Sequence, residues 1–120
     1  MAFPATHNFS YYRGDTNQFV IRPKNSDGSA FDLDGYDADF FIATARGAAT
    51  SVVQYEAQAI VNDNTNIVTC TILPGVGEDL SPGTYVYDVQ IDKTVSGVLS
   101  VFTLLTGNIT VTEQVSGAVV

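Results

Sequence analysis

Apolar and polar residues alternate with a period of two along most of the chain. In the clearest run, residues 84–92, the alternate positions are Tyr85, Tyr87, Val89 and Ile91. A period of two is typical of a β-strand that buries one face and exposes the other. The pattern therefore predicts a strand whose two tyrosines, valine and isoleucine point into a core.

The same period predicts seven further strands, at residues 8–12, 18–23, 38–44, 52–61, 66–73, 98–105 and 109–112. The polar cluster Asn62–Thr65 predicts the turn of a hairpin, and Gly107–Asn108 predicts a break between the last two strands. One helical turn is expected, at Glu78–Leu80. The residues that the alternation places in the core of the other strands include Phe19, Ile21, Phe40, Ile42, Val68, Cys70 and Ile72.

Seven to eight short strands, separated by turns rich in Gly, Asn, Asp and Pro, are typical of an antiparallel β-sandwich of immunoglobulin-like type. At 120 residues, the chain has the size of one such domain. We expect a single sandwich domain over residues 1–120, with its core at about 8–112 and extended N- and C-terminal arms. The sequence holds one cysteine and no tryptophan, so it lacks the cysteine–tryptophan–cysteine signature of antibody domains. The pattern predicts only their architecture.

The charge balance argues against nucleic acid and against a membrane surface as partners. Thirteen acidic residues face five basic ones, which gives a formal net charge of −8. Affinity for phosphate backbones and for anionic lipids comes from clustered lysine and arginine, which this chain does not have. The first residues show neither the basic region nor the apolar stretch of a secretory signal, so we expect synthesis in a cytoplasm.

Residues suited to catalysis are few. His7 is the only histidine and lies in the predicted N-terminal arm, and Cys70 is the only cysteine and occupies a predicted core position. A serine–histidine or cysteine–histidine pair would have to be built on His7, and no glycine-rich phosphate loop is present. We therefore expect no enzymatic activity and no cofactor.

Four aspartates, Asp32, Asp34, Asp37 and Asp39, lie within eight residues and could supply oxygen ligands to Ca²⁺. Gly35 falls at position 4 of this stretch and Ala43 at position 12, where an EF-hand loop needs its glycine at position 6 and a glutamate at position 12. We favour a solvated turn that leads into the next strand, and expect no metal site.

The tripeptide Arg13–Gly14–Asp15 matches a sequence by which some proteins engage integrins. A glycine followed by residues that bond to nearby backbone amides is also typical of a tight bend. We interpret the tripeptide as a turn after the first strand.

The order of several motifs resembles a known group of modules. These motifs are Arg13–Thr16 before a strand, Asp27–Gly28, Asp32–Gly35 before Ala38–Ile42, Leu80–Gln90, and Thr103–Val111. Together they are similar to the N-terminal domain of siphophage baseplate upper proteins and to related small tail or decoration proteins of tailed phages. The resemblance spans roughly residues 10–112, nearly the whole chain.

The resemblance implies a phage virion structural protein that works without catalysis, on the tail or baseplate or as a decoration (cement) protein on the capsid. Its partners would be other virion proteins, such as tail, baseplate or major capsid protein, with several copies of the chain on a symmetric particle. An immunoglobulin-like binder of a ligand or carbohydrate is the alternative. Exposed aromatic side chains aligned in one groove would distinguish that alternative.

The two ends of the chain are the predicted contact elements. Extended apolar segments can add to the open edge of a neighbour's sheet, where they gain main-chain hydrogen bonds. The candidate partner-binding residues are Phe3, Pro4, Val115, Val119 and Val120.

Overall fold

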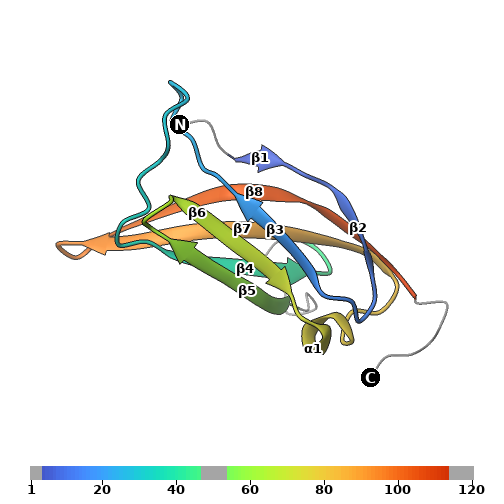
Figure 1. Ribbon diagram of the computed structural model, residues 1–120. Helices are drawn as coiled ribbons and strands as arrows, with labels where there is room; N and C mark the ends of the chain where they lie inside the picture. The colour runs from blue at the N-terminus through green and yellow to red at the C-terminus, as the bar shows by residue number, and fades with distance from the viewer. Residues whose placement is uncertain (1–3, 47–53, 114–120) are drawn as a thin grey trace.

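A computed structural model of the chain describes residues 4–46 and 54–113 (Figure 1). Within them it contains strands and one helical turn. In chain order these are β1 (Ala5–Thr6), β2 (Phe9–Tyr12), β3 (Asn17–Ile21), β4 (Asp37–Ala43), β5 (Gln54–Asn62), β6 (Ile67–Ile72), α1 (Pro74–Gly77), β7 (Gly83–Val95) and β8 (Val98–Thr112). The prediction of an all-β chain with seven to eight strands is confirmed.

The strands form one curled sheet in the order β1-β8-β7-β4-β5-β6-β3, and β2 also pairs with β8. Most neighbours are antiparallel, but β1 and β2 run parallel to β8, which corrects the expectation of a fully antiparallel arrangement. Parallel neighbours need a long connection, and here nearly the whole chain lies between the paired strands. The first strands of the chain, β1 and β2, and the last strand, β8, therefore lie side by side at one edge of the sheet.

Strand β5 makes the sheet curl. Its first residues, Gln54–Ala57, pair with β4, and its last, Gln58–Asn62, pair with β6. The ring of Phe19 on β3 consequently lies against inward-facing rings from the middle strands of the sheet. Its ring centroid is 5.5 Å from that of Phe40 on β4 and 6.4 Å from that of Tyr87 on β7. A single core fills the inside of the curl.

The core residues match the alternation in the sequence. Tyr85, Tyr87, Val89 and Ile91 are all buried, as are Phe40 and Ile42 on β4 and Val68, Cys70 and Ile72 on β6. Strands β5 and β6 form the predicted hairpin, closing at the pair Asn62 and Ile67. The predicted faces are thus confirmed on β4, β6 and β7.

Two local predictions are wrong. The predicted strands 98–105 and 109–112 are one continuous strand, β8, which pairs with β7 throughout and shifts register once, between Val89 and Gln90. The helical turn lies at Pro74–Gly77 instead of Glu78–Leu80, because Pro74 presets the first helical position directly after the extended Leu73.

We expect Val89→Asp to unfold the domain, because the carboxylate would enter a core position with no charged partner, at a cost of more than about 3 kcal/mol. Val95→Asp is the matched control, since Val95 lies on the same strand with 55% of its surface exposed. Thermal melts followed by circular dichroism would compare the two. Equal melting temperatures would contradict the assignment of the inner face of β7.

Candidate interaction surface

The N-terminal segment is part of the sheet from Ala5 onward. Ala5 and Thr6 pair with β8, and the His7 amide donates a hydrogen bond to the Thr106 carbonyl at 2.9 Å. The Tyr87 hydroxyl donates to the His7 carbonyl at 2.6 Å. We expected an N-terminal arm over residues 1–7 with no strand, and for Ala5 and Thr6 this is wrong.

Gly107 explains both the tight docking of this segment and the continuity of β8. A Cβ atom at Gly107 would overlap the His7 carbonyl oxygen and crowd the Asn8 side chain, whose Oδ1 accepts a hydrogen bond from the Asn108 amide. The glycine is therefore needed for close approach of another strand, a role that sequence reasoning mistook for a break.

The candidate partner-binding residues are only partly within the described structure. Pro4 is exposed and immediately precedes β1. Phe3, Val115, Val119 and Val120 lie outside the described residues. Since proline has no amide hydrogen, Pro4 cannot donate a main-chain hydrogen bond to β8.

The first part of β8 exposes a group of aliphatic side chains. Residues 98–103 pair with β7, and Leu104 lies where the register shifts. Val98, Leu99 and Val101 in this stretch have 48–66% of their surface exposed. Figure 1 shows the β7–β8 hairpin reaching past the ends of the other strands. The sequence analysis assigned residues 98–105 to a strand but did not single out these side chains as exposed.

A pocket lies where the curled sheet stays open, between the last residue of β3 and the β1–β8 edge. It has a volume of about 200 Å³ and is lined by Ala5, Ile21, Arg22, Pro23, Lys24, Leu104 and Leu105. The lining is mostly aliphatic, and its two basic side chains come from the segment after β3. It can receive an apolar side chain but offers no acid–base pair for chemistry.

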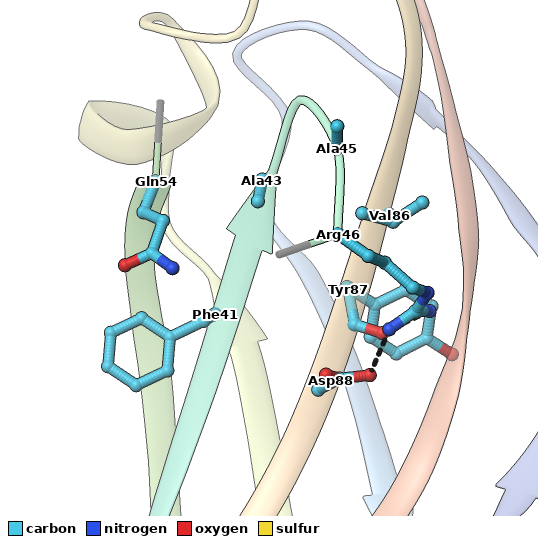
Figure 2. A pocket seen from close by; sticks show the side chains of 8 residues that line it. All are labelled: Phe41, Ala43, Ala45, Arg46, Gln54, Val86, Tyr87 and Asp88. Atoms are coloured by element: carbon cyan, nitrogen blue, oxygen red, sulfur yellow. Dashed lines mark hydrogen bonds and ion pairs between the residues drawn. The ribbon is translucent and has the colours of Figure 1, made fainter. Parts of the chain in front are cut away.

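A second pocket, of about 110 Å³, lies beside Arg46 (Figure 2). The Arg46 guanidinium forms an ion pair with Asp88 at 2.7 Å and also donates to the hydroxyl of Thr106 and the carbonyl of Tyr87. The arginine thus fastens the segment after β4 onto β7 and β8. Because its donors already have protein partners, we assign this pocket a structural role.

The aspartate-rich stretch forms the expected turn. Asp32 accepts a hydrogen bond from the Asp34 amide, Gly35 adopts a φ of 79°, and the Lys93 ammonium donates to the Asp34 carbonyl at 3.0 Å. Asp37 and Asp39 are exposed, as predicted. In residues 4–46 and 54–113, no three His, Cys, Asp or Glu side chains are grouped closely enough to hold a metal ion. The absence of calcium binding stays a prediction.

The outer face of β4 and β7 is acidic. Partial burial raises the pKa of Asp39, and the nearby carboxylates of Asp92, Glu56 and Asp37 raise it further. Asp37 and Asp92 also stand opposite each other in the ladder. Like charges placed this way repel one another, so this face is unsuited to an anionic partner.

Arg13–Gly14–Asp15 is a turn, as predicted. Gly14 has a φ of 85°, the Asp15 amide donates to the Tyr12 carbonyl, and two nitrogens of Arg13 donate to the Glu78 carbonyl at 2.7 and 3.1 Å. The arginine therefore ties this turn to the segment that follows α1. Its side chain serves the fold.

Comparisons with known proteins give only weak likenesses. The sequence matches no protein-family model and no curated protein. A solved family 123 glycoside hydrolase from Clostridium perfringens is 13% identical, with a TM-score of 0.36, and the match covers 91% of this chain but only 23% of the hydrolase. AggA, the major subunit of aggregative adherence fimbriae type I from Escherichia coli, is 12% identical, with a TM-score of 0.29, covering 82% of this chain and 95% of AggA. At such scores neither likeness carries an argument.

None of the helices in the described part of the chain has the length and apolar character to cross a membrane.

We expect Gly107→Ala to destabilise the protein by about 2 kcal/mol, because the added methyl group must push the His7 carbonyl away from β8. Gly75→Ala is the control, since a Cβ atom there meets no atom within 4 Å. Chemical denaturation measures the stability, and amide exchange at residues 5–9 locates the damage. Unchanged exchange at these residues in Gly107→Ala would contradict the close approach of the two strands.

Burial raises the pKa of the Cys70 thiol to about 12. At pH 8 only about one thiol in 10,000 is then ionised, and the side chain is also inaccessible to reagents. We expect the folded protein to resist a thiol-reactive chromophore at pH 8 and to react stoichiometrically above the denaturation midpoint. Rapid labelling of the folded protein would overturn the assignment of Cys70 as a core residue.

Proposed function

We propose that the chain is a non-enzymatic assembly module of a bacteriophage virion, present in several copies on the tail, baseplate or capsid surface. The observation that carries this proposal is the exposed aliphatic stretch of β8, with Val98, Leu99 and Val101, on a chain of formal net charge −8. Exposed apolar side chains gathered on one surface are sites at which another protein can dock.

The exposed side chains favour assembly over carbohydrate binding. Among the described residues, the large apolar side chains that are exposed comprise one aromatic, Tyr12, and several aliphatic residues: Val20, Ile60, Leu73, Val95, Val98, Leu99 and Val101. Sugars are held by stacking on aromatic rings, whereas aliphatic side chains suit dry protein contacts. The alternative function, an immunoglobulin-like ligand or carbohydrate binder, thus finds less support on this surface.

The virion setting is supported by the resemblance of the sequence motifs to phage tail and decoration modules. In the structure, two of these motifs have defined roles. Arg13–Asp15 forms the turn before β3, and Asp32–Gly35 forms the turn before β4.

We also propose that the curled sheet is an open form of the immunoglobulin-like sandwich. The Tyr85 hydroxyl, at the start of β7, donates to the Ser81 carbonyl four residues upstream at 2.9 Å, as in the tyrosine corner of such sandwiches. The division of β5 between β4 and β6 supports the same interpretation, because it gives the sheet two facing halves.

The terminal residues Phe3, Pro4, Val115, Val119 and Val120 complete the proposal as contacts with neighbouring virion proteins. Residues 5–7 are better regarded as part of the domain, since they are bonded to β8 and Tyr87. The relevant N-terminal segment is therefore residues 1–4.

The test uses particles released by the cells that make this chain, banded on a density gradient and analysed by quantitative mass spectrometry. We expect the chain in the particle band in a constant ratio to the major structural protein. Removal of residues 114–120 should reduce incorporation by about tenfold or more while the melting temperature is kept. Thr65→Ala, in the exposed turn between β5 and β6, should be incorporated normally. Absence of the full chain from the particles would refute the proposal, and saturable binding on a glycan array would favour the alternative.

A further inference from the structure

We propose that a pocket between β4 and β5 binds an extended, basic segment of another protein. The pocket has a volume of about 490 Å³ and lies where these two neighbouring strands separate. The proposed function does not use this surface, and the inference does not depend on the virion setting. Three properties of the pocket carry it: main-chain groups that face the opening, an apolar floor and an acidic rim.

The pocket is an opening in the ladder between β4 and β5. The pairing of these strands ends at Phe40 with Ala57, and beyond this pair β5 continues beside β6 instead. In the same register, the next opposite residues would be Ala38 on β4 and Ala59 on β5. Both line the pocket, so its two walls are strands that would otherwise pair with each other.

The alternation of main-chain groups along β4 shows which of them face the pocket. The β7–β8 hairpin closes on a two-residue turn, which makes Val95 and Val98 a hydrogen-bonded pair. Successive residues of a strand bond to opposite sides, so the even-numbered residues of β7 bond to β4. Their partners on β4 are Asp37 and Asp39. Ala38 lies between these two, and its N–H and C=O therefore point the other way, toward the pocket.

The opposite wall presents main-chain groups as well. By the same alternation Phe40 bonds to Ala57 on β5, so Ala59 and Val61 also direct their N–H and C=O groups to the β4 side. In the described part of the chain, no strand pairs with β5 on this side beyond Ala57. Donors and acceptors thus face the pocket from both walls, and an extended chain can pair with such groups.

The side chains around the pocket define the chemistry of this segment. Ala38, Ala59 and Val61 are half-buried and pack against the core, so they form an apolar floor. Asp37 and Asp63 are exposed and form the rim. An extended segment points alternate side chains to opposite faces. Aliphatic residues would therefore rest on the floor, and basic residues would lie beside the two carboxylates.

The charge at the rim favours a cationic partner. Asp92 stands opposite Asp37 in the ladder, and its Oδ1 is buried with no hydrogen-bond partner among the described residues. The Lys93 ammonium lies 5.3 Å from the centre of the Tyr36 ring and already donates to the Asp34 carbonyl. Negative charge therefore remains at the rim, where lysine or arginine side chains of a partner would offset it.

The first test titrates the full chain with the blocked peptide Lys-Val-Lys-Val-Lys by isothermal calorimetry. The peptide Glu-Val-Glu-Val-Glu is the charge control. The lysine peptide N-methylated at both valines is the main-chain control, because it keeps the charge and loses two amide donors. We expect the lysine peptide to bind at least about tenfold more tightly than either control.

The second test locates the site by reversing one charge. Asp63→Lys should weaken binding of the lysine peptide by about tenfold or more, because it places an ammonium group at the rim. Asp79→Lys is the matched control and should change binding by less than about threefold. Asp79 is also exposed, but it lies beyond α1, at the end of β6 away from the pocket. Circular dichroism would verify that both variants fold.

The third test is amide hydrogen exchange with the peptide at saturation. The amides of Ala38, Ala59 and Val61 should exchange at least about tenfold more slowly than in the free chain, because they gain partners. The amides of Gln58 and Ile60, which point to β6, should change little.

The inference would be overturned by a lysine peptide that fails to bind at millimolar concentration or that binds no better than its N-methylated form. Unchanged exchange of the three amides, or an equal effect of the two charge reversals, would also overturn it. Each of these results leaves particle incorporation, measured separately, free to support the proposed function. The two proposals therefore fail in distinguishable ways.

Discussion

Pairing of β7 with β8 is the interaction on which the rest of the structure depends. These are the two longest strands in the described part of the chain. Strand β7 also supplies four alternate residues to the core: Tyr85, Tyr87, Val89 and Ile91. Strands β1 and β2 pair with the other side of β8, and β4 pairs with the other side of β7. The hairpin therefore lies between two parts of the sheet that do not pair with each other directly. The hairpin is longer than its neighbours, and Val95, Val98 and Leu99 near its turn are exposed. The same pairing thus supports both the core and an exposed apolar stretch.

Polar groups divide between two roles in this architecture. Arg13 and Arg46 bind backbone carbonyls and fasten irregular segments onto the sheet. Several acidic side chains instead lie on the outer face of β4 and β7, where desolvation and then repulsion by neighbouring carboxylates raise the pKa of Asp39. Surface ion pairs such as Arg46 with Asp88 add little stability in water, so the arrangement depends on apolar burial and on main-chain bonding.

The sequence predicts the fold well where one face of a strand is buried, because burial imposes the period of two. Val68, Cys70 and Ile72, and the stripe on β7, were found in this way. The period carries no information on which strands are neighbours, so the parallel docking of β1 and β2 on β8 could not be foreseen. Gly107 was interpreted as a break because its actual constraint, contact with His7, comes from the other end of the chain. The exposure of Val98, Leu99 and Val101 was missed for a similar reason, since burial depends on neighbours that the local pattern does not identify.

The pairing of β2 with β8 also constrains how the chain can fold during synthesis. The side chain of Asn8 accepts a hydrogen bond from the amide of Asn108, a separation of 100 residues. Contacts so distant in sequence form slowly, because a long loop must close before they contribute free energy. The first strands therefore emerge from the ribosome without their partner and must wait, unpaired, until β8 has been made. Completion of the domain must therefore await the synthesis of β8, and a nascent chain truncated before β8 would leave the main-chain groups of β7 that face β8 without partners.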